Sequence, residues 1–168
     1  IQKIPMHGGS IRVFVSKKKC KRVINYKKIN NLIKQEDKYK LKHISTFINF
    51  SNKIAEEREK LSNFFNKISN YRIYGYGAPA KAVTLINFFN LNHKNINLII
   101  DDSKLKQQKY IPGTKIKIHD SRILKTKPPK YIVILAWNVY KDILNKIKKY
   151  DEIEYAIIPL PKFKIIKL

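Results

Sequence analysis

The chain has 168 residues, of which 43% are hydrophobic, and this is enough for one compact domain with additional elements. No segment approaches the roughly 18 consecutive apolar residues of a membrane span, and no charged-then-apolar leader opens the sequence. We therefore expect a cytoplasmic protein with neither a membrane span nor a signal peptide. A single cysteine, Cys20, excludes an internal disulfide and has no Cys or His neighbours at the spacing of a zinc site. We expect no metal.

The formal net charge of +24 would ordinarily suggest a nucleic acid or another anionic partner. Only five of the 36 basic residues are Arg, and the excess of Lys comes with an excess of Ile and Asn, the residues that A/T-rich codons favour. This pattern indicates compositional drift of surface positions, because a surface that reads phosphates would use more Arg. We expect no specific nucleic-acid partner, and a general positive field that favours a small anionic ligand.

Residues 1–70 contain one short β-prone segment and a long helical pattern. The chain begins with Ile1, and we expect it to be part of a longer polypeptide. Residues 11–15 (Ile-Arg-Val-Phe-Val) follow a glycine turn and predict a strand that leaves a sheet. Apolar residues at three- and four-residue intervals predict a helix over 38–68, with a break near 49–52 left open. A helix that links two domains is favoured over one that binds a partner.

From residue 71 onward, short apolar segments alternate with helical patterns. Strands are predicted at 71–74, 96–100, 115–118, 131–136 and 155–158, with helices at 79–89 and 139–150. Strands in such an alternation form a parallel sheet covered on both faces. The fold class is therefore α/β: a Rossmann-like, mostly parallel sheet with helices on both faces, preceded by a long linker helix and a strand remnant of an upstream domain.

A glycine turn lies where the first strand of this domain meets its first helix. Gly75 and Gly77 allow a tight turn and close approach of a ligand, and the amides at the start of the following helix favour an anion. The turn has Ala80 or Lys81 where a dinucleotide-binding fingerprint has its third glycine, so it does not support NAD binding. The alternative is that the glycines serve only the strand-to-helix geometry.

Three further residues follow predicted strands. Asp101 is at the position where Rossmann domains place a carboxylate that binds ribose hydroxyls, although an Asp there also starts turns. Trp137 and Asn138 follow a buried strand at the edge where open α/β sheets bind ligands. The Trp137 ring could stack on a base or sugar, or cover the core.

His7 lies in the N-terminal glycine turn, where a structural role is favoured over catalysis.

The ordered motifs resemble a known family. They read HGGSIR, then a long helix, YGYGAPAKAVTLINFF, IIDDSKLKQQKYIPGTKI, PPKYIVILAWN and IIPLP. Together they resemble the C-terminal region of S-adenosylmethionine-dependent nucleotide-sugar C-methyltransferases, which build branched deoxysugars. One departure lies in the polar loop, where the family tends to have Pro and a Lys-Gln-Gly run but this sequence has Leu105 and Lys106-Gln107-Gln108.

The resemblance implies a three-part enzyme that removes a proton beside a keto group of the nucleotide sugar and methylates the resulting carbanion. Residues 1–22 would be the tail end of an upstream methyltransferase domain, 23–70 a helical linker and 71–168 the Rossmann-like C-terminal domain. S-adenosylmethionine would be bound by the upstream domain and not by this chain, whose partner would be the nucleotide-sugar substrate. No catalytic residue is expected here, and the substrate-binding candidates are Gly75, Tyr76, Gly77, Ala78, Lys81, His7, Arg12, Asp101, Trp137 and Asn138.

Two other functions fit the residues less specifically. The glycine turn and Asp101 also suit a stand-alone nucleotide- or dinucleotide-binding module. Net charge alone would suit a basic nucleic-acid-binding protein.

Overall fold

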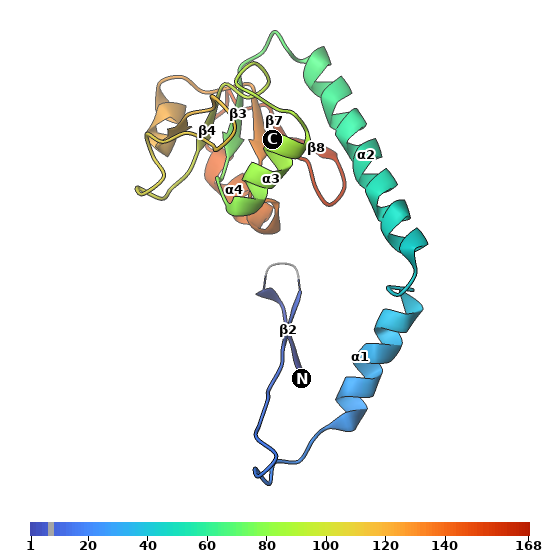
Figure 1. Cartoon of the computed structure of the whole chain (residues 1–168). Coiled ribbons are helices and arrows are strands. Elements are labelled where there is room, and N and C mark those ends of the chain that lie inside the picture. Colours follow the sequence, from blue (N-terminus) through green and yellow to red (C-terminus); the bar gives the residue numbers. More distant parts are fainter. Residues whose placement is uncertain (7–8) are drawn as a thin grey trace. The chain divides into compact units, whose positions relative to one another are not determined.

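A computed structural model describes residues 1–6 and 9–168, and it divides into the units Ile1–Ile54 and Ala55–Leu168 (Figure 1). We call them the N-terminal unit and the C-terminal unit and describe each by itself. His7 lies outside the described residues.

The N-terminal unit consists of a hairpin and helices. Strand β1 (Gln2–Ile4) pairs antiparallel with β2 (Ser10–Arg12), so the predicted strand at 11–15 is confirmed only over its first two residues. Helix α1 (Tyr26–Lys38) begins at Asn25, whose side chain accepts a hydrogen bond from the Lys28 amide. Helix α2 (Ile44–Lys67) passes through 49–52 without a break. The interruption lies instead between the two helices, where Lys40 has a φ of 54°.

The C-terminal unit is built on a six-stranded sheet of order β5-β4-β3-β6-β7-β8, in which only β8 is antiparallel to its neighbour. This arrangement confirms the predicted α/β, mostly parallel fold. The strands are β3 (Ile73–Tyr76), β4 (Leu98–Ile100), β5 (Ile118–His119), β6 (Tyr131–Ile134), β7 (Tyr155–Ile158) and β8 (Lys164–Lys167). The helices are α3 (Ala80–Phe88) and α4 (Tyr140–Ile147), with 3-10 turns η2 (Ser121–Lys125) and η3 (Trp137–Val139).

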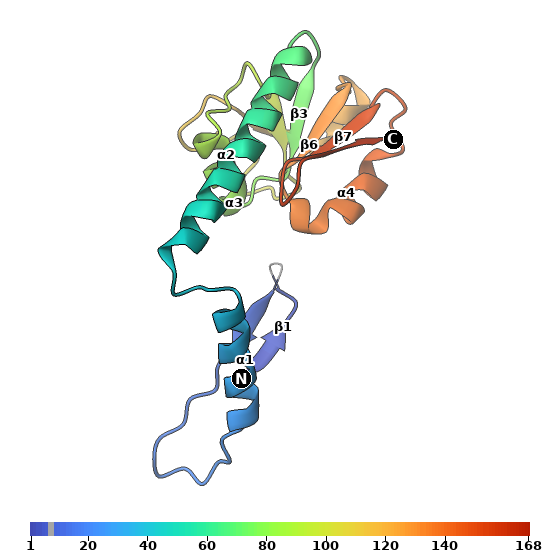
Figure 2. The same cartoon turned by 90° about the vertical axis from the view of Figure 1, so that its right-hand side faces the viewer.

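Apolar side chains on both faces of the sheet explain why its inner strands are buried. On one face, α4 packs its residues Ile143, Leu144 and Ile147 onto side chains of the inner strands. The opposite face is covered by the second half of α2, where Phe64 meets the Tyr131 ring edge-on at 6.1 Å. Figure 2 shows α3 and α4 on opposite sides of the sheet, as right-handed crossovers in opposite directions require.

The strand order also fixes where a ligand would bind. From β3 the chain crosses to β4, whereas from β6 it crosses to β7 on the other side. The carboxyl ends of β3 and β6 therefore form the topological switch point, where open α/β sheets bind their ligands.

Among the described residues, no helix is long and apolar enough to cross a membrane.

Candidate functional site

The glycine turn is held between the carboxyl ends of β4 and β6, the two strands on either side of β3. Gly77 has a φ of +89°, and a Cβ atom there would lie 2.7 Å from the Cβ of Ala136, two residues beyond the end of β6. Its amide donates a hydrogen bond of 2.7 Å to the carbonyl oxygen of Ile100, at the end of β4. Glycine is therefore required at this position, because a side chain would meet both the unfavourable backbone conformation and the neighbouring strand.

Gly75 has a different role. It lies inside β3, where an added Cβ would be 2.6 Å from Cγ1 of Ile99 and 2.8 Å from Cδ1 of Leu135. Close packing of the central strands explains this glycine, a reason that differs from the strand-to-helix geometry considered in the sequence. Contact between Gly75 and a ligand stays a prediction.

The Asp101 side chain holds the glycine turn in place by hydrogen bonds. It is only 11% exposed. One carboxylate oxygen accepts hydrogen bonds from the Ala78 amide at 2.7 Å and the Lys106 ammonium at 3.2 Å, and the other accepts from the Ser103 amide at 2.9 Å. The Ala78 amide and the Asp101 carboxylate therefore satisfy each other within the protein. This geometry matches the turn-forming alternative for Asp101, and its ribose contact stays a prediction.

Lys81, Trp137 and Asn138 come together at the switch point, although 57 positions separate Lys81 from Asn138. The Lys81 ammonium donates a hydrogen bond to the Asn138 side-chain oxygen and lies 4.5 Å from the centre of the Trp137 ring. Lys81 is in the first turn of α3, while the other two follow β6 in η3. Burial lowers the pKa of Lys81, because the charged form loses solvation. We call these three residues the switch-point cluster.

The start of α3 adds hydrogen-bond donors to this cluster. Pro79 caps the helix without a side-chain hydrogen bond, and the first turn contains no acidic residue. The first amides of a helix have no acceptor within it and carry a partial positive charge. The helix start and Lys81 together therefore present positive charge at the carboxyl edge of the sheet.

A second polar cluster lies at the end of β4, and the sequence analysis did not identify it. The Tyr76 hydroxyl lies 3.2 and 3.4 Å from the two Asp102 carboxylate oxygens, and the Lys146 ammonium of α4 lies 2.7 Å from one of them. Burial raises the pKa of the Tyr76 hydroxyl, and the negative charge of Asp102 raises it further. The signal in the sequence was the second Asp of the pair that follows the strand.

In the loop after β4, Gln108 has a left-handed backbone conformation that favours glycine. Its φ is 64°, and its amide donates to the carbonyl oxygen of Ile118 at 2.8 Å. Gln107 donates from its side-chain amide to the Asp101 carbonyl oxygen at 3.0 Å. The departure from the family pattern therefore leaves a turn in place, at the cost of backbone strain at Gln108.

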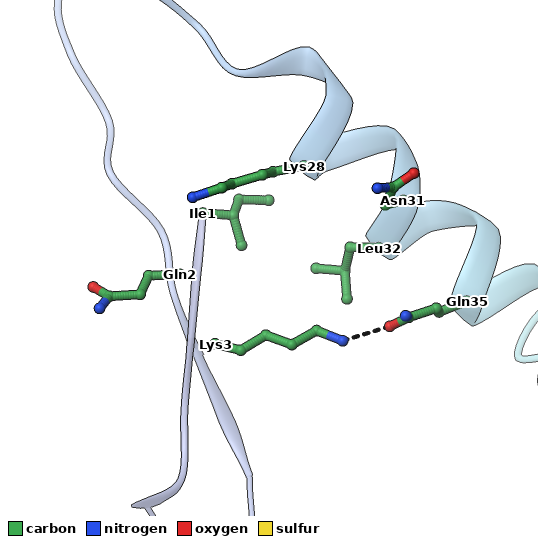
Figure 3. A pocket seen from close by; sticks show the side chains of 7 residues that line it. All are labelled: Ile1, Gln2, Lys3, Lys28, Asn31, Leu32 and Gln35. Carbon is green, nitrogen blue, oxygen red and sulfur yellow. Dashed lines mark hydrogen bonds between the residues drawn. The ribbon is translucent and has the colours of Figure 1, made fainter.

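Arg12 belongs to the N-terminal unit, where it is an exposed residue at the end of β2. Its expected role in substrate binding stays a prediction, and His7 lies outside the described residues. The N-terminal unit also contains a pocket of about 340 Å³ between β1 and α1 (Figure 3). Lys3 donates a hydrogen bond to Gln35 across this pocket, and none of the predicted site residues that the structure describes lines it.

Residues 5–161 match the family described as the C-methyltransferase C-terminal domain. The chain belongs to this family. The match includes both the glycine turn and the switch-point cluster, so these features are within the C-methyltransferase C-terminal domain and not in an addition to it.

A curated relative of this C-methyltransferase C-terminal domain is the C-methyltransferase NovU of Streptomyces niveus. The two sequences are 26% identical over 164 residues, which is 96% of this chain. The aligned part is 39% of NovU, so this chain spans well under half the length of that relative.

Proposed function

We propose that this chain is the nucleotide-sugar-binding C-terminal part of an S-adenosylmethionine-dependent sugar C-methyltransferase. The observation that carries the proposal is the switch-point cluster of Lys81, Trp137 and Asn138 at the carboxyl ends of β3 and β6. An ammonium, an aromatic ring and an amide beside a helix start match the diphosphate, base and hydroxyl groups of a nucleotide sugar.

Each member of the cluster has a distinct part in this proposal. The Lys81 ammonium and the first amides of α3 bind the diphosphate. The half-buried Trp137 ring offers a face to the base, and the exposed Asn138 amide offers a donor and an acceptor. The cationic cluster does not suit S-adenosylmethionine, which carries a sulfonium cation and no phosphate, so we assign that cofactor to an upstream domain.

The methyl-transfer step itself would take place in that upstream domain. S-adenosylmethionine supplies an electrophilic methyl group, and the sugar supplies a carbanion after a base removes the proton beside its keto group. The role of this chain is to hold the nucleotide end of the substrate, so that the sugar is oriented toward the reacting centre.

The same proposal gives the three segments of the chain different roles. Residues 1–22 would complete the upstream methyltransferase domain, and residues 71–168 would bind the nucleotide. Residues 23–70 would link these two parts. Among the described residues, 21 large apolar side chains are exposed, and 15 of them lie in the N-terminal unit, from Met6 to Phe50. Exposed apolar side chains gathered in this way mark an interaction surface, which an adjoining domain of the same polypeptide would cover.

Calorimetric titration of the 168-residue chain tests the nucleotide site. We expect thymidine diphosphate to bind and to change the fluorescence of Trp137, the single tryptophan. Lys81→Ala should weaken this binding by about 1–2 kcal/mol, as for a charge-assisted contact. Lys127→Ala is the matched control, because exposed Lys127 precedes the amino end of β6 and should leave the affinity unchanged.

Three outcomes of this titration would contradict the proposal. Equal affinities of wild type and Lys81→Ala would make Lys81 an ordinary surface residue. Binding of NAD or NADP without thymidine diphosphate would favour the stand-alone dinucleotide-binding module, which the strand order also suits. Lys81→Ala and Lys127→Ala could also weaken binding equally, with moderate salt abolishing binding to wild type and both variants. The general positive field would then account for the binding.

A further inference from the structure

The Lys81 ammonium lies on the aromatic surface that the proposed function assigns to the base. It is over the Trp137 ring, 4.5 Å from the ring centre, and it donates a hydrogen bond to the side-chain oxygen of Asn138. Trp137 is partly buried, so only part of its ring is open to a ligand. A base that stacks on this ring must therefore compete with the ammonium for it.

Lys81 is held differently from the two lysines that contact the aspartates after β4. Lys106 pairs with the carboxylate of Asp101, and Lys146 pairs with that of Asp102. The partners of Lys81 in the described part of the chain are a neutral amide oxygen and an aromatic ring. Neutral partners bind an ammonium less strongly than phosphate oxygens do, because hydrogen bonds between two ions are shorter and stronger. A diphosphate can therefore take Lys81 from its present partners.

The position of Lys81 in α3 allows this exchange without a backbone movement. Lys81 is the second residue of the helix, and long side chains on a helix point back toward the helix start. The amides of Ala80 and Lys81 at that start have no acceptor within the helix and favour an anion. Rotation of the flexible lysine stem can therefore carry the ammonium from the Trp137 ring to an anion bound at the helix start.

We infer that Lys81 makes stacking on Trp137 conditional on the phosphates of the ligand, and that Asn138 is the positioning residue that holds the ammonium over the ring. The inference rests on the proposed function. A diphosphate draws Lys81 to the helix start and leaves the ring to the base. A nucleoside without phosphate offers the ammonium no such partner and must displace it unaided. Lys81 is thus a specificity-determining residue that selects nucleoside diphosphates over nucleosides.

NMR titrations of the 168-residue chain with thymidine and with thymidine diphosphate separate this role from an ordinary phosphate contact. Lys81→Ala should weaken thymidine diphosphate binding about tenfold and tighten thymidine binding about tenfold, because loss of the ammonium frees the ring for the uncharged ligand. Lys81→Arg keeps a cation that stacks on aromatic faces, so it should bind thymidine as weakly as wild type. Lys127→Ala, the exposed control, should leave both affinities unchanged.

The same titrations follow the position of the ammonium. In the free protein, the ring current of Trp137 should shift the ε-methylene protons of Lys81 upfield. Thymidine diphosphate should return these protons to the ordinary lysine position as the side chain leaves the ring. Asn138→Ala should reduce the upfield shift before any ligand is added, because Lys81 loses the oxygen that holds it there. An unchanged shift in Asn138→Ala would overturn the positioning role.

The remaining outcomes separate this inference from the proposed function. Lys81→Ala could weaken thymidine diphosphate binding and bind thymidine no more tightly than wild type does. That result would overturn the inference and leave the nucleotide site standing. Tighter thymidine binding by Lys81→Arg would also overturn the inference, because a cation over the ring would then not exclude the base. Failure of wild type to bind thymidine diphosphate would overturn the proposed function together with the inference.

Discussion

Two phenylalanines on helix α2 show how differently the two units use their apolar residues. Phe65, in the C-terminal unit, is 2% exposed, whereas Phe47, in the N-terminal unit, is 52% exposed. The C-terminal unit has a continuous core on both faces of its sheet. In the N-terminal unit no described residue is buried. One unit can hold its fold through its own core, while the other exposes the kind of surface that a further domain would cover.

The largest expected effect comes from truncating these two side chains. Phe65→Ala should lower the free energy of unfolding by about 3–5 kcal/mol, because it leaves a cavity between α2 and the sheet. Phe47→Ala should change it by less than about 0.5 kcal/mol, since little buried area is lost. Urea denaturation of the 168-residue chain, followed by circular dichroism, measures both. Losses of similar size would mean that the N-terminal unit also has a core.

Gly77 and Gly9 both have a positive φ, and each lies in a different unit. Gly77→Ala should destabilise by about 1–3 kcal/mol, because its Cβ would lie 2.7 Å from that of Ala136 as well as meeting an unfavourable φ. Gly9→Ala, in the N-terminal unit, would find nothing within 4 Å. We expect the main unfolding transition in denaturant to shift for Gly77→Ala and to stay in place for Gly9→Ala. A shift of the same size for Gly9→Ala would argue that the units unfold together.

Glu57 tests how residues 55–67 of α2 are attached to the rest of the C-terminal unit. The hydrogen bond from Lys60 lowers the pKa of Glu57, and the hydrogen bond from the Phe163 amide at 2.9 Å lowers it further. Stability from a lowered carboxyl pKa is present above the unfolded value and is lost as pH falls through the folded one. Glu57→Gln should therefore cost about 0.5–1.5 kcal/mol at neutral pH and progressively less in acid.

Thermal unfolding of wild type and Glu57→Gln between neutral and strongly acidic pH measures this difference. Glu56→Gln, an exposed neighbour on the same helix, is the control. A difference between wild type and Glu57→Gln that stays constant with pH would show that the negative charge of Glu57 does not strengthen its hydrogen bond with the Phe163 amide.

Gln108 should give the smallest effect, and one of opposite sign. Gln108→Gly should stabilise the C-terminal unit by about 0.5–1 kcal/mol, because relief of the left-handed backbone outweighs the added freedom of the unfolded chain. The hydrogen bond from the residue 108 amide to Ile118 would be retained, since it involves only backbone atoms. A loss of stability in denaturant unfolding would mean that the Gln108 side chain contributes contacts that outweigh the strain.

The C-terminal sheet was largely predictable because its strands are apolar throughout and the segments between them have helical periodicity. The strand predicted at 155–158 coincides with β7, and the strand predicted at 131–136 contains β6. Strand β8 was not predicted, since its alternating Lys-Ile-Ile-Lys sequence gives a weak signal at an exposed edge. Helix α1 was included only in a general linker, although its apolar residues Ile29, Leu32 and Ile33 recur at helical spacing.

The candidate site was predictable only in part. Lys81, Trp137 and Asn138 could be placed at one edge from strand ends alone, and the structure brings them together. The different roles of Asp101 and Asp102 could not be predicted, because they depend on contacts with α4 and with the glycine turn that are distant in sequence. Sequence pattern locates an edge of a sheet, but side-chain pairing across the sheet decides which carboxylate is buried and which is half-exposed.

An amide and indole NMR titration of the 168-residue chain with thymidine diphosphate tests the nucleotide site at the switch point most directly. We expect the largest chemical-shift changes at the Ala80 and Lys81 amides in the first turn of α3, at the Trp137 indole and at the Asn138 side chain. Changes confined to the basic residues 17–22 of the N-terminal unit, with the carboxyl edge of the sheet unchanged, would contradict the proposed site.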